Sequence, residues 1–417
     1  MPLASSSVVQ VRVIPELTFG TVPVDGNPRN LRVTGETLDF VISKEQSKEI
    51  NATRTITSVI PVTANSSGGV SGEISYQEWD VLMASTLQST PVVYGTSGVA
   101  GTASTFAYTA TTITNSVTAL TLTDRWTGDA VSPVMGQWFQ VQHSGNANDK
   151  KVFRISTSVA PTATVITLDA STPATVVGAS AGGKIATSRL THGTTQTSLT
   201  IERNAFDITQ FMAYTGMTPS KMSVGVSSGS LSTISFDFMG KSVQTGAVTQ
   251  LPGTPIASYA YDIHSGVSGV TGSTWATCIL WEAGIPLAGT FVKSISLDFD
   301  NTLRSQEAIC TLGAVSIGSG TIQVSGSMSV YFADLALFNK FKANTNSSII
   351  FSSLDANNNG YIFTIPVANI SSWKTNASGK DSDMMVDIQF IGLRDAANAT
   401  PALQKAIFID RVGALLV

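Results

Sequence analysis

Short runs of β-branched and apolar residues, separated by glycine, serine and proline, recur along most of the chain. Threonine and valine favour extended backbone, whereas glycine and serine favour the turns between strands. In the N-terminal part, the pattern predicts strands at residues 8–14, 31–34, 37–42 and 55–62. A mainly β protein with antiparallel strands is therefore expected.

Two stretches have the apolar spacing of helices. Residues 76–84 follow Ser75, and residues 330–341 follow Ser329. A serine placed before an apolar pattern with a period of three to four residues is a typical N-cap. The sequence therefore predicts two short helices, each capped by its serine.

An internal repeat relates the surroundings of these two helices. Three matches, in the same order in both copies, pair residues 38–40 with 297–299, residues 70–75 with 324–329 at an offset of 254, and residues 234–240 with 386–392. Residues 197–201 and 348–351 are comparable strands between the second and third matches. The repeat predicts duplicated β-sandwich or barrel units, each with one short α-helix.

The spacing of the matches predicts an insertion in the first copy. Val70 and Gly240 are 170 positions apart but Val324 and Gly392 only 68, an excess of about 102 residues. A surface loop tolerates such an insertion, so we expect a small inserted all-β domain at residues 93–193, with strands at these positions: 138–142, 151–155 and 164–168.

The remaining boundaries follow from that insertion. The first unit comprises residues 1–92 and 194–245. A connector rich in glycine follows at residues 246–285. The second unit comprises residues 286–417.

Charge is sparse along the chain. Charged residues make up 12% of it and hydrophobic residues 42%, against roughly 25% charged residues in an ordinary soluble domain. A largely neutral surface suits a protein that buries its faces in an assembly. The net charge of −4 comes without any run of basic residues, so specific nucleic-acid binding is not expected. Neither a signal peptide nor a membrane span is expected.

Motifs that could carry chemistry are weak. Residues 225–229 and 178–182 both fit G-x-S-x-G, but the first stretch lies between strand-like runs, so a β-turn is expected there. Residues 355–360 (DANNNG) imitate the start of a calcium loop, but Pro366 occupies the twelfth position, where glutamate is required. A hairpin turn is expected there instead.

Isolated candidate residues support no site. Surface or loop positions are expected for His143, His192 and His264, and a solvated turn for Asp381 and Asp383. We expect buried free thiols at Cys278 and Cys310, and core positions for Trp79, Trp126 and Trp138. No catalytic, cofactor-binding or metal-binding residue is predicted, and no cofactor.

The first copy resembles the tail tube proteins of siphophages, the phages with long non-contractile tails. The motifs that carry the resemblance are residues 32–40, 68–76 with Trp79 and Asp80, 199–203, 214–217 and 236–241 (FDFMGK). It implies a structural, non-enzymatic protein of the virion tail, made in the host cytoplasm. It also implies rings of six tube units stacked around a lumen that holds the tape-measure protein and later passes DNA. Tail terminator and distal tail or baseplate proteins are the implied partners, with no membrane contact.

Two units in each chain favour a trimer with pseudo-six-fold symmetry, while a hexamer with an outer second copy is the alternative. The acidic composition predicts a lumen wall that repels DNA, formed by residues 31–42 and 70–75 and their counterparts. A β-rich adhesin or capsid decoration protein is the competing function, although it does not explain the repeat. A depolymerase is a weaker alternative, because carboxylate pairs within aromatic-rich stretches are absent.

Overall fold

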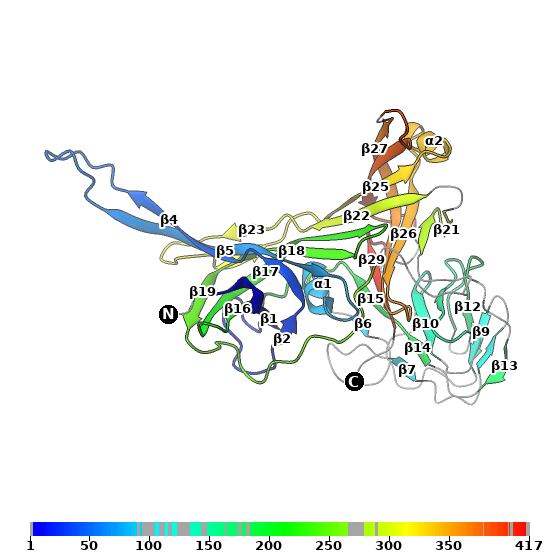
Figure 1. The fold of residues 1–417 in the computed structure, drawn as a ribbon, viewed down its shortest axis with the longest axis horizontal. Helices are drawn as coiled ribbons and strands as arrows, with labels where there is room; N and C mark the ends of the chain where they lie inside the picture. The colour runs from blue at the N-terminus through cyan, green and yellow to red at the C-terminus, as the bar shows by residue number, and fades with distance from the viewer. Residues whose placement is uncertain are drawn as a thin grey trace.

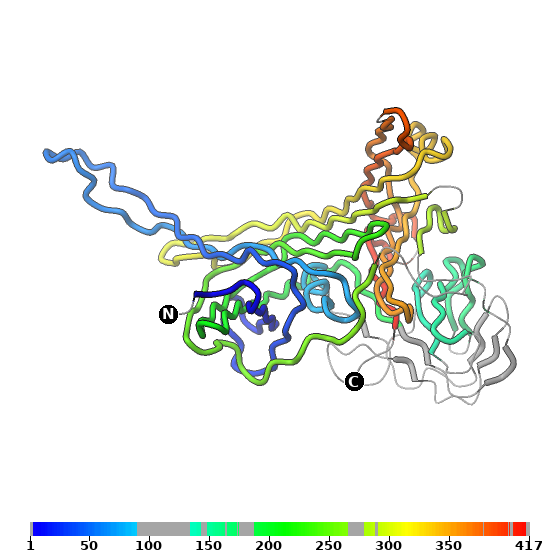
Figure 2. The backbone as a smooth tube through the Cα atoms, in the orientation of Figure 1, coloured from blue at the N-terminus to red at the C-terminus, as the bar shows by residue number. Residues whose placement is uncertain are grey.

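In the computed structural model the chain forms an elongated β molecule with two bodies and a projecting hairpin (Figures 1 and 2). The structure describes residues 3–89, 92–93, 105–107, 113–115, 119–122, 134–142, 148–162, 165–172, 174, 177–180, 184–265, 279–287, 291–377, 379–398, 400 and 403–413. Antiparallel pairing dominates, as the sequence predicts. No helix in these ranges is long and apolar enough to span a membrane.

The first body begins with a 3-10 turn, η1 (Ser6–Val8), and pairs its strands in the order β3/β4–β5–β18–β17–β16–β1–β2, with β19 also on β17. The bounds are β1 Val9–Pro15, β2 Arg29–Leu31, β3 Val33–Glu36, β4 Asp39–Gln46, β5 Val59–Glu73, β16 Leu199–Ala205, β17 Gln210–Ser227, β18 Thr233–Gly240 and β19 Ser242–Gly246. The predicted strands at residues 8–14 and 37–42 are thereby confirmed to within a few residues, whereas the strand predicted at 31–34 is divided at Arg32 between β2 and β3.

The second body pairs its strands in the order β22–β25–β28–β27–β26–β20, with β29 also on β27 and β21 on β20. The bounds are β20 Leu280–Glu282, β21 Ile285–Pro286, β22 Val292–Asp300, β25 Gln323–Tyr331, β26 Ser347–Leu354, β27 Gly360–Asn376, β28 Met385–Leu393 and β29 Phe408–Val412. Between β22 and β25 lies a small hairpin of β23 (Arg304–Gln306) and β24 (Ser316–Gly318).

The two bodies share bulge positions as well as pairing order. The β17–β18 register shifts between Pro219 and Lys221, and the β27–β28 register shifts between Ile370 and Ser372. A second shift follows Leu199 in β16 and Ser347 in β26. A bulge inserts one unpaired residue and bends the strand, so both long strands bend at corresponding places.

The register corrects one detail of the sequence repeat. Gly68 lies opposite Phe238, and Gly326 lies opposite Phe390, so Gly68 and Gly326 are corresponding positions in β5 and β25. The V-S-G motifs instead match Gly72 to Gly326, which is four positions out of register. Side chains alternate between the two faces of a strand with period two, so an alignment error of four residues leaves every side chain on the same face. The pattern of buried positions therefore could not reveal this error.

A direct joint connects the two bodies. The second half of β17 pairs with β22 from Lys221 opposite Asp300 to Ser227 opposite Ser294. The strands β3/β4, β5, β18, β17, β22, β25, β28 and β27 therefore form one continuous sheet across the molecule (Figure 1). One face of this sheet carries the main core, in which Phe236, Met222 and Phe299 are fully buried in neighbouring strands.

Both predicted helices exist, but they begin later than predicted. Helix α1 spans Asp80–Thr86 and α2 spans Ala336–Lys342, with Trp79 and Leu335 at the N-cap positions and no side-chain cap bond. Ser75 instead bridges to Ile263. Ser329 belongs to β25, where pairing with β22 and β28 overrides the helical spacing, so both serine caps are wrong.

The strand predicted at residues 55–62 is also misplaced. Residues 55–58 lie outside any strand, and β5 starts at Val59 and runs without a break to Glu73. Together with β4 it forms the hairpin that projects from the first body (Figure 2).

The chain leaves the bodies between β6 (Val92–Val93) and β15 (Ser188–Thr191), which pair with each other, while β15 also pairs with β29. Between them lie two four-stranded sheets, β11–β10–β14–β7 and β12–β9–β8–β13. Their bounds are β7 Thr105–Ala107, β8 Ile113–Asn115, β9 Ala119–Leu122, β10 Trp138–Gln142, β11 Val152–Arg154, β12 Val165–Thr167, β13 Val177–Ser180 and β14 Lys184–Ala186. The three strands predicted here are confirmed as β10, β11 and β12.

Candidate assembly surfaces

The motifs that imitate catalytic or calcium sites are turns. Residues 225–229 end β17 and enter the turn to β18, where Gly229 has a φ of 75°. Asp355 closes the β26–β27 hairpin by accepting the backbone N–H groups of Asn357 and Asn359, both at 2.8 Å. Both predicted turns are confirmed, and of residues 178–182 only 178–180 lie within the described residues. Among the described residues, no three His, Cys, Asp or Glu side chains converge on a common point.

His264 lies in a loop, one of the two predicted alternatives, but it is not at the surface. It is fully buried, its Nδ1 lies 3.0 Å from the Ser353 hydroxyl, and its backbone bonds to Ile74 and Ser232. Burial lowers the pKa of His264 to about 3. His264 thus bonds to both bodies, to Ile74 and Ser232 in the first and to Ser353 in the second, which its Gly/Ser-rich context does not reveal.

Of the other predictions for single residues, some are confirmed and one is wrong. Trp79 and Trp138 are core residues as predicted, and Asp381 and Asp383 lie in an exposed turn. Cys310 is exposed, so its predicted burial is wrong, because its loop leaves the sheet next to β23. His192 lies half-buried in a loop, and burial with nearby Lys405 lowers its pKa to about 4. Cys278, Trp126 and His143 lie outside the described residues.

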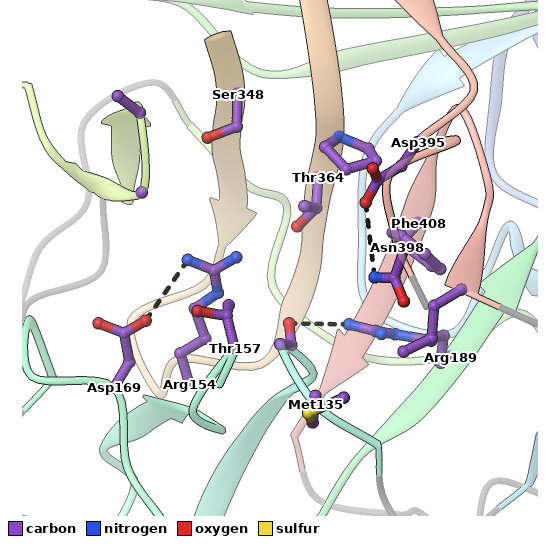
Figure 3. Close-up of a pocket in the computed structure, with 15 residues that line it drawn as sticks. Met135, Arg154, Thr157, Asp169, Arg189, Ser348, Thr364, Asp395, Asn398 and Phe408 are labelled. Carbon is purple, nitrogen blue, oxygen red and sulfur yellow. Dashed lines mark hydrogen bonds and ion pairs between the residues drawn. The ribbon is translucent and has the colours of Figure 1, made fainter. Parts of the chain in front are cut away.

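A cavity of about 430 Å³ separates β11 from β26, β27 and β29 (Figure 3). Its cationic side chains are already paired: Arg154 lies 3.6 Å from Asp169, and Arg189 bonds Asp410 at 2.6 Å. Its described lining includes no histidine, cysteine or lysine. Because carboxylates already pair with both arginines, we interpret the cavity as part of the packing between these sheets.

The segment around β10 and β11 is anchored on the second body by a shared apolar cluster. Trp138 packs edge-on against Trp281, with ring centroids 5.0 Å apart, in a cluster that includes Ile350 and Ile362. The Gln140 amide also donates to the backbone carbonyls of the β26–β27 turn, at 2.9 Å. The four-stranded sheet that contains β10 and β11 is therefore held by more than its linkers.

The continuous sheet presents a polar face opposite its core. Directly opposed residues in antiparallel strands share a face, so one row runs through Ser71, Ser235, Ser223, Asp298 and Ser325. The same face carries these charged residues: the carboxylates Asp39, Glu73, Asp237, Asp298, Asp300 and Asp387, and the lysines Lys221 and Lys374. Carboxylates outnumber lysines, so we call this the acidic face.

The continuous sheet has two free edges. Within the described residues, β3 and β4 pair only with β5, and residues 372–376 of β27 pair only with β28. Unpaired N–H and C=O groups at a sheet edge are a template for another chain. Another strand can therefore pair with the sheet at either edge.

The hairpin of β4 and β5 adds exposed apolar surface next to one free edge. Val41 is 51% exposed and Ile60 is 60% exposed. The corresponding connection between β22 and β25 instead lies on the first body, where Asn301 donates to the Thr86 carbonyl at 2.7 Å. Gln88 donates to the Ser319 hydroxyl at 2.6 Å in the same contact. One connection therefore contacts the first body of the same chain, while the other projects away from it.

The family comparison agrees with a role in assembly. No curated protein sequence matches the chain. The family model of the phage tail tube protein matches residues 6–392. This match covers the strands of both bodies except β29 and the last residue of β28, and it includes both free edges; its family is structural and not enzymatic. The chain therefore belongs to the phage tail tube protein family and is a structural component of the virion tail.

Proposed function

We propose that the chain contains two tail-tube units and that three chains close into a pseudo-six-fold ring of a siphophage tail tube. The observation that carries the proposal is the agreement of the two bodies in strand order, register and bulge position. Two unrelated sheets have no reason to share both bulges. Closing the sheet into a barrel removes its free edges, which stabilises the ring against irregular aggregation.

The acidic face is proposed as the lumen wall. It is polar, and its opposite face is the core, so it remains the surface available to the interior of a closed barrel. Its excess of carboxylates over lysines repels DNA phosphates, which would let DNA slide without being retained. The tape-measure protein before ejection and DNA during ejection are then the lumen's occupants, with terminator and distal tail proteins at the two ends of the tube.

The two four-stranded sheets are proposed to form an inserted domain on the outer wall of the tube. They lie between two sequence-distant strands, β6 and β15, that pair with each other. A domain inserted between adjacent strand ends leaves the fold of its host intact. The bodies can then close around the lumen without these sheets taking part.

Ring mass tests the stoichiometry. Each chain has a mass of 43.6 kDa, so a ring of six chains is twice as heavy as a ring of three. Native mass spectrometry of isolated rings should give three chain masses, and cryo-electron microscopy should show three-fold symmetry with six similar lobes. A ring of six chains would refute the trimer and favour the hexamer in which only the first unit lines the tube. Isolated spikes without rings would favour the adhesin.

A further inference from the structure

The two free edges lie on β27 and β4. These strands correspond to β17 and β22, which already pair at the joint between the two bodies of one chain. We propose that residues 372–377 of one chain pair antiparallel with residues 36–41 of the next chain, with Lys374 directly opposite Asp39 of that second copy. This inference rests on the proposed ring and specifies the contact that closes it.

The bulges define the register on one side of the contact. Lys221 follows the bulge in β17, and Ser372 follows the bulge in β27, so these two residues are corresponding positions. Two positions further along each strand, Ser223 corresponds to Lys374. Ser223 lies opposite Asp298 at the internal joint, so Lys374 should lie opposite the counterpart of Asp298.

The neighbouring strands β25 and β5 define the register on the other side of the contact. Asp298 lies opposite Ser325 in β25, and Asp39 lies opposite Ser67 in β5. Ser67 and Ser325 are themselves corresponding positions, because they precede Gly68 and Gly326, the residues opposite Phe238 and Phe390. Asp39 is therefore the counterpart of Asp298. The L-D-F motif occurs in both copies because, in each, it lies on the strand that pairs with the preceding unit of the ring.

The side chains at the proposed contact are complementary. At the internal joint, Asp298 accepts from the Ser223 hydroxyl and lies 3.8 Å from the Lys221 amine. Asp39 and Lys374 are exposed, and neither has an ion pair within the described part of the chain. Opposite charges directly across an antiparallel pair stabilise it, so the lysine of one chain meets the carboxylate of the next.

The apolar side of the contact is also complementary. The same register places Trp373 opposite Phe40, where the internal joint places Met222 opposite Phe299. Met222 and Phe299 are fully buried, whereas Trp373 and Phe40 are half-buried in the single chain. Pairing with a second copy would cover this aromatic pair and extend the core across the chain boundary.

The proposed contact also positions the projecting hairpin of β4 and β5. At the internal joint, the connection between β22 and β25 lies on the body that supplies β17. The equivalent hairpin of β4 and β5 would then lie on the second body of the neighbouring chain. That position would cover Val41 and Ile60, which a single chain leaves in solvent.

Disulfide trapping tests the register. In a parent with Cys278→Ser and Cys310→Ser, the pair Asp39→Cys and Lys374→Cys should cross-link assembled rings into covalent dimers and trimers on a non-reducing gel. Directly opposed residues have Cα atoms about 4.5–5.5 Å apart, within the range a disulfide spans. The control pairs Lys374→Cys with Ser43→Cys, four positions along β4 and roughly 14 Å away, and should give at least ten-fold less cross-linked product.

The outcomes separate the two proposals. Rings that form normally but cross-link through Ser43→Cys, or through neither pair, overturn the register and leave the ring itself standing. A parent that forms neither rings nor tubes contradicts the proposed function, and the contact with it.

A charge exchange keeps the test decisive if the cysteine pair does not assemble. Asp39→Lys and Lys374→Asp should each reduce ring yield at least ten-fold, while the double variant restores it. Failure of the double variant to recover, when both single variants remain folded, also overturns the contact.

Discussion

The buried ion pair between β15 and β29 allows a quantitative test of how these two strands, which are distant in sequence, are held together. Arg189 and Asp410 are directly opposed in the strand pair and form two hydrogen bonds of 2.6 Å. Their side chains are only 4% and 0% exposed. Asp410 also accepts the backbone N–H of Trp138 at 3.2 Å. Replacing Asp410 therefore affects β15, β29 and the adjacent small sheet together.

The substitution Asp410→Asn should lower the free energy of unfolding by about 3–5 kcal/mol, because it leaves the Arg189 guanidinium buried without its counter-charge. Removing both charges avoids that penalty, so Arg189→Met with Asp410→Leu should be less destabilised than Asp410→Asn alone. Urea unfolding followed by tryptophan fluorescence is a suitable assay, because Trp138 and Trp281 lie next to the pair.

The exposed pair Lys221–Asp298, at 3.8 Å, provides the matched control. Asp298→Asn should change the free energy of unfolding by less than about 1 kcal/mol, as is usual for ion pairs in solvent. A loss below about 1 kcal/mol for Asp410→Asn, or a double variant less stable than Asp410→Asn, would refute the reasoning.

Four further expectations follow from other parts of the structure. Gly326→Ala should destabilise the second body by about 1–3 kcal/mol in urea unfolding, because its Cβ would lie 2.4 Å from the Ser296 carbonyl oxygen; wild-type stability would contradict this. The pKa of His264 is lowered to about 3 in the folded protein, so this residue should lower stability by about 1.4 kcal/mol per pH unit as the pH falls from 6.5 to about 3, where only the unfolded chain gains the proton. His192, whose pKa is lowered to about 4, should add to the slope above pH 4. His264→Gln should reduce the slope by the share of His264, and an unchanged slope would exclude this cause. Deleting residues 94–187 with a Gly/Ser bridge should leave ring formation intact in electron micrographs while lowering stability by exposing Trp281; a folded variant without rings would disprove an outer insertion. Rings with Asp237→Lys and Asp387→Lys should bind short DNA at about 50 mM salt and release it near 200 mM, whereas wild-type rings should not; strong wild-type binding would contradict a repelling wall.

Short runs of β-branched and aromatic residues were enough to predict some of the strands. The predictions at 138–142 and 37–42 succeeded because such residues are concentrated there, in β10 and β4. The helix predicted at 330–341 began too early, because Val330 lies in the core as part of a strand. Spacing by three or four residues can satisfy both periodicities over a short run, and pairing with β22 and β28 decided the outcome.

Features that depend on distant partners could not be predicted. The burial of His264 depends on Ser353, which is 89 positions away. The pairing of β17 with β22 depends on strands that are about 75 positions apart in the sequence and belong to different bodies. The sequence contains the L-D-F motif at residues 297–299 but does not reveal its place at the joint, because that place is defined only when the two bodies lie side by side.

The bulges in β17 and β27 have a mechanical consequence. Each long strand pairs with one set of partners up to Met217 or Ala368 and, just before its bulge, changes to another set. The same covalent backbone therefore runs from the continuous sheet, which bears the acidic face, into the layer packed behind it. A force that pulls these two layers apart acts along peptide bonds as well as across side-chain contacts, so the layers should not separate unless the long strands β17 and β27 are themselves deformed.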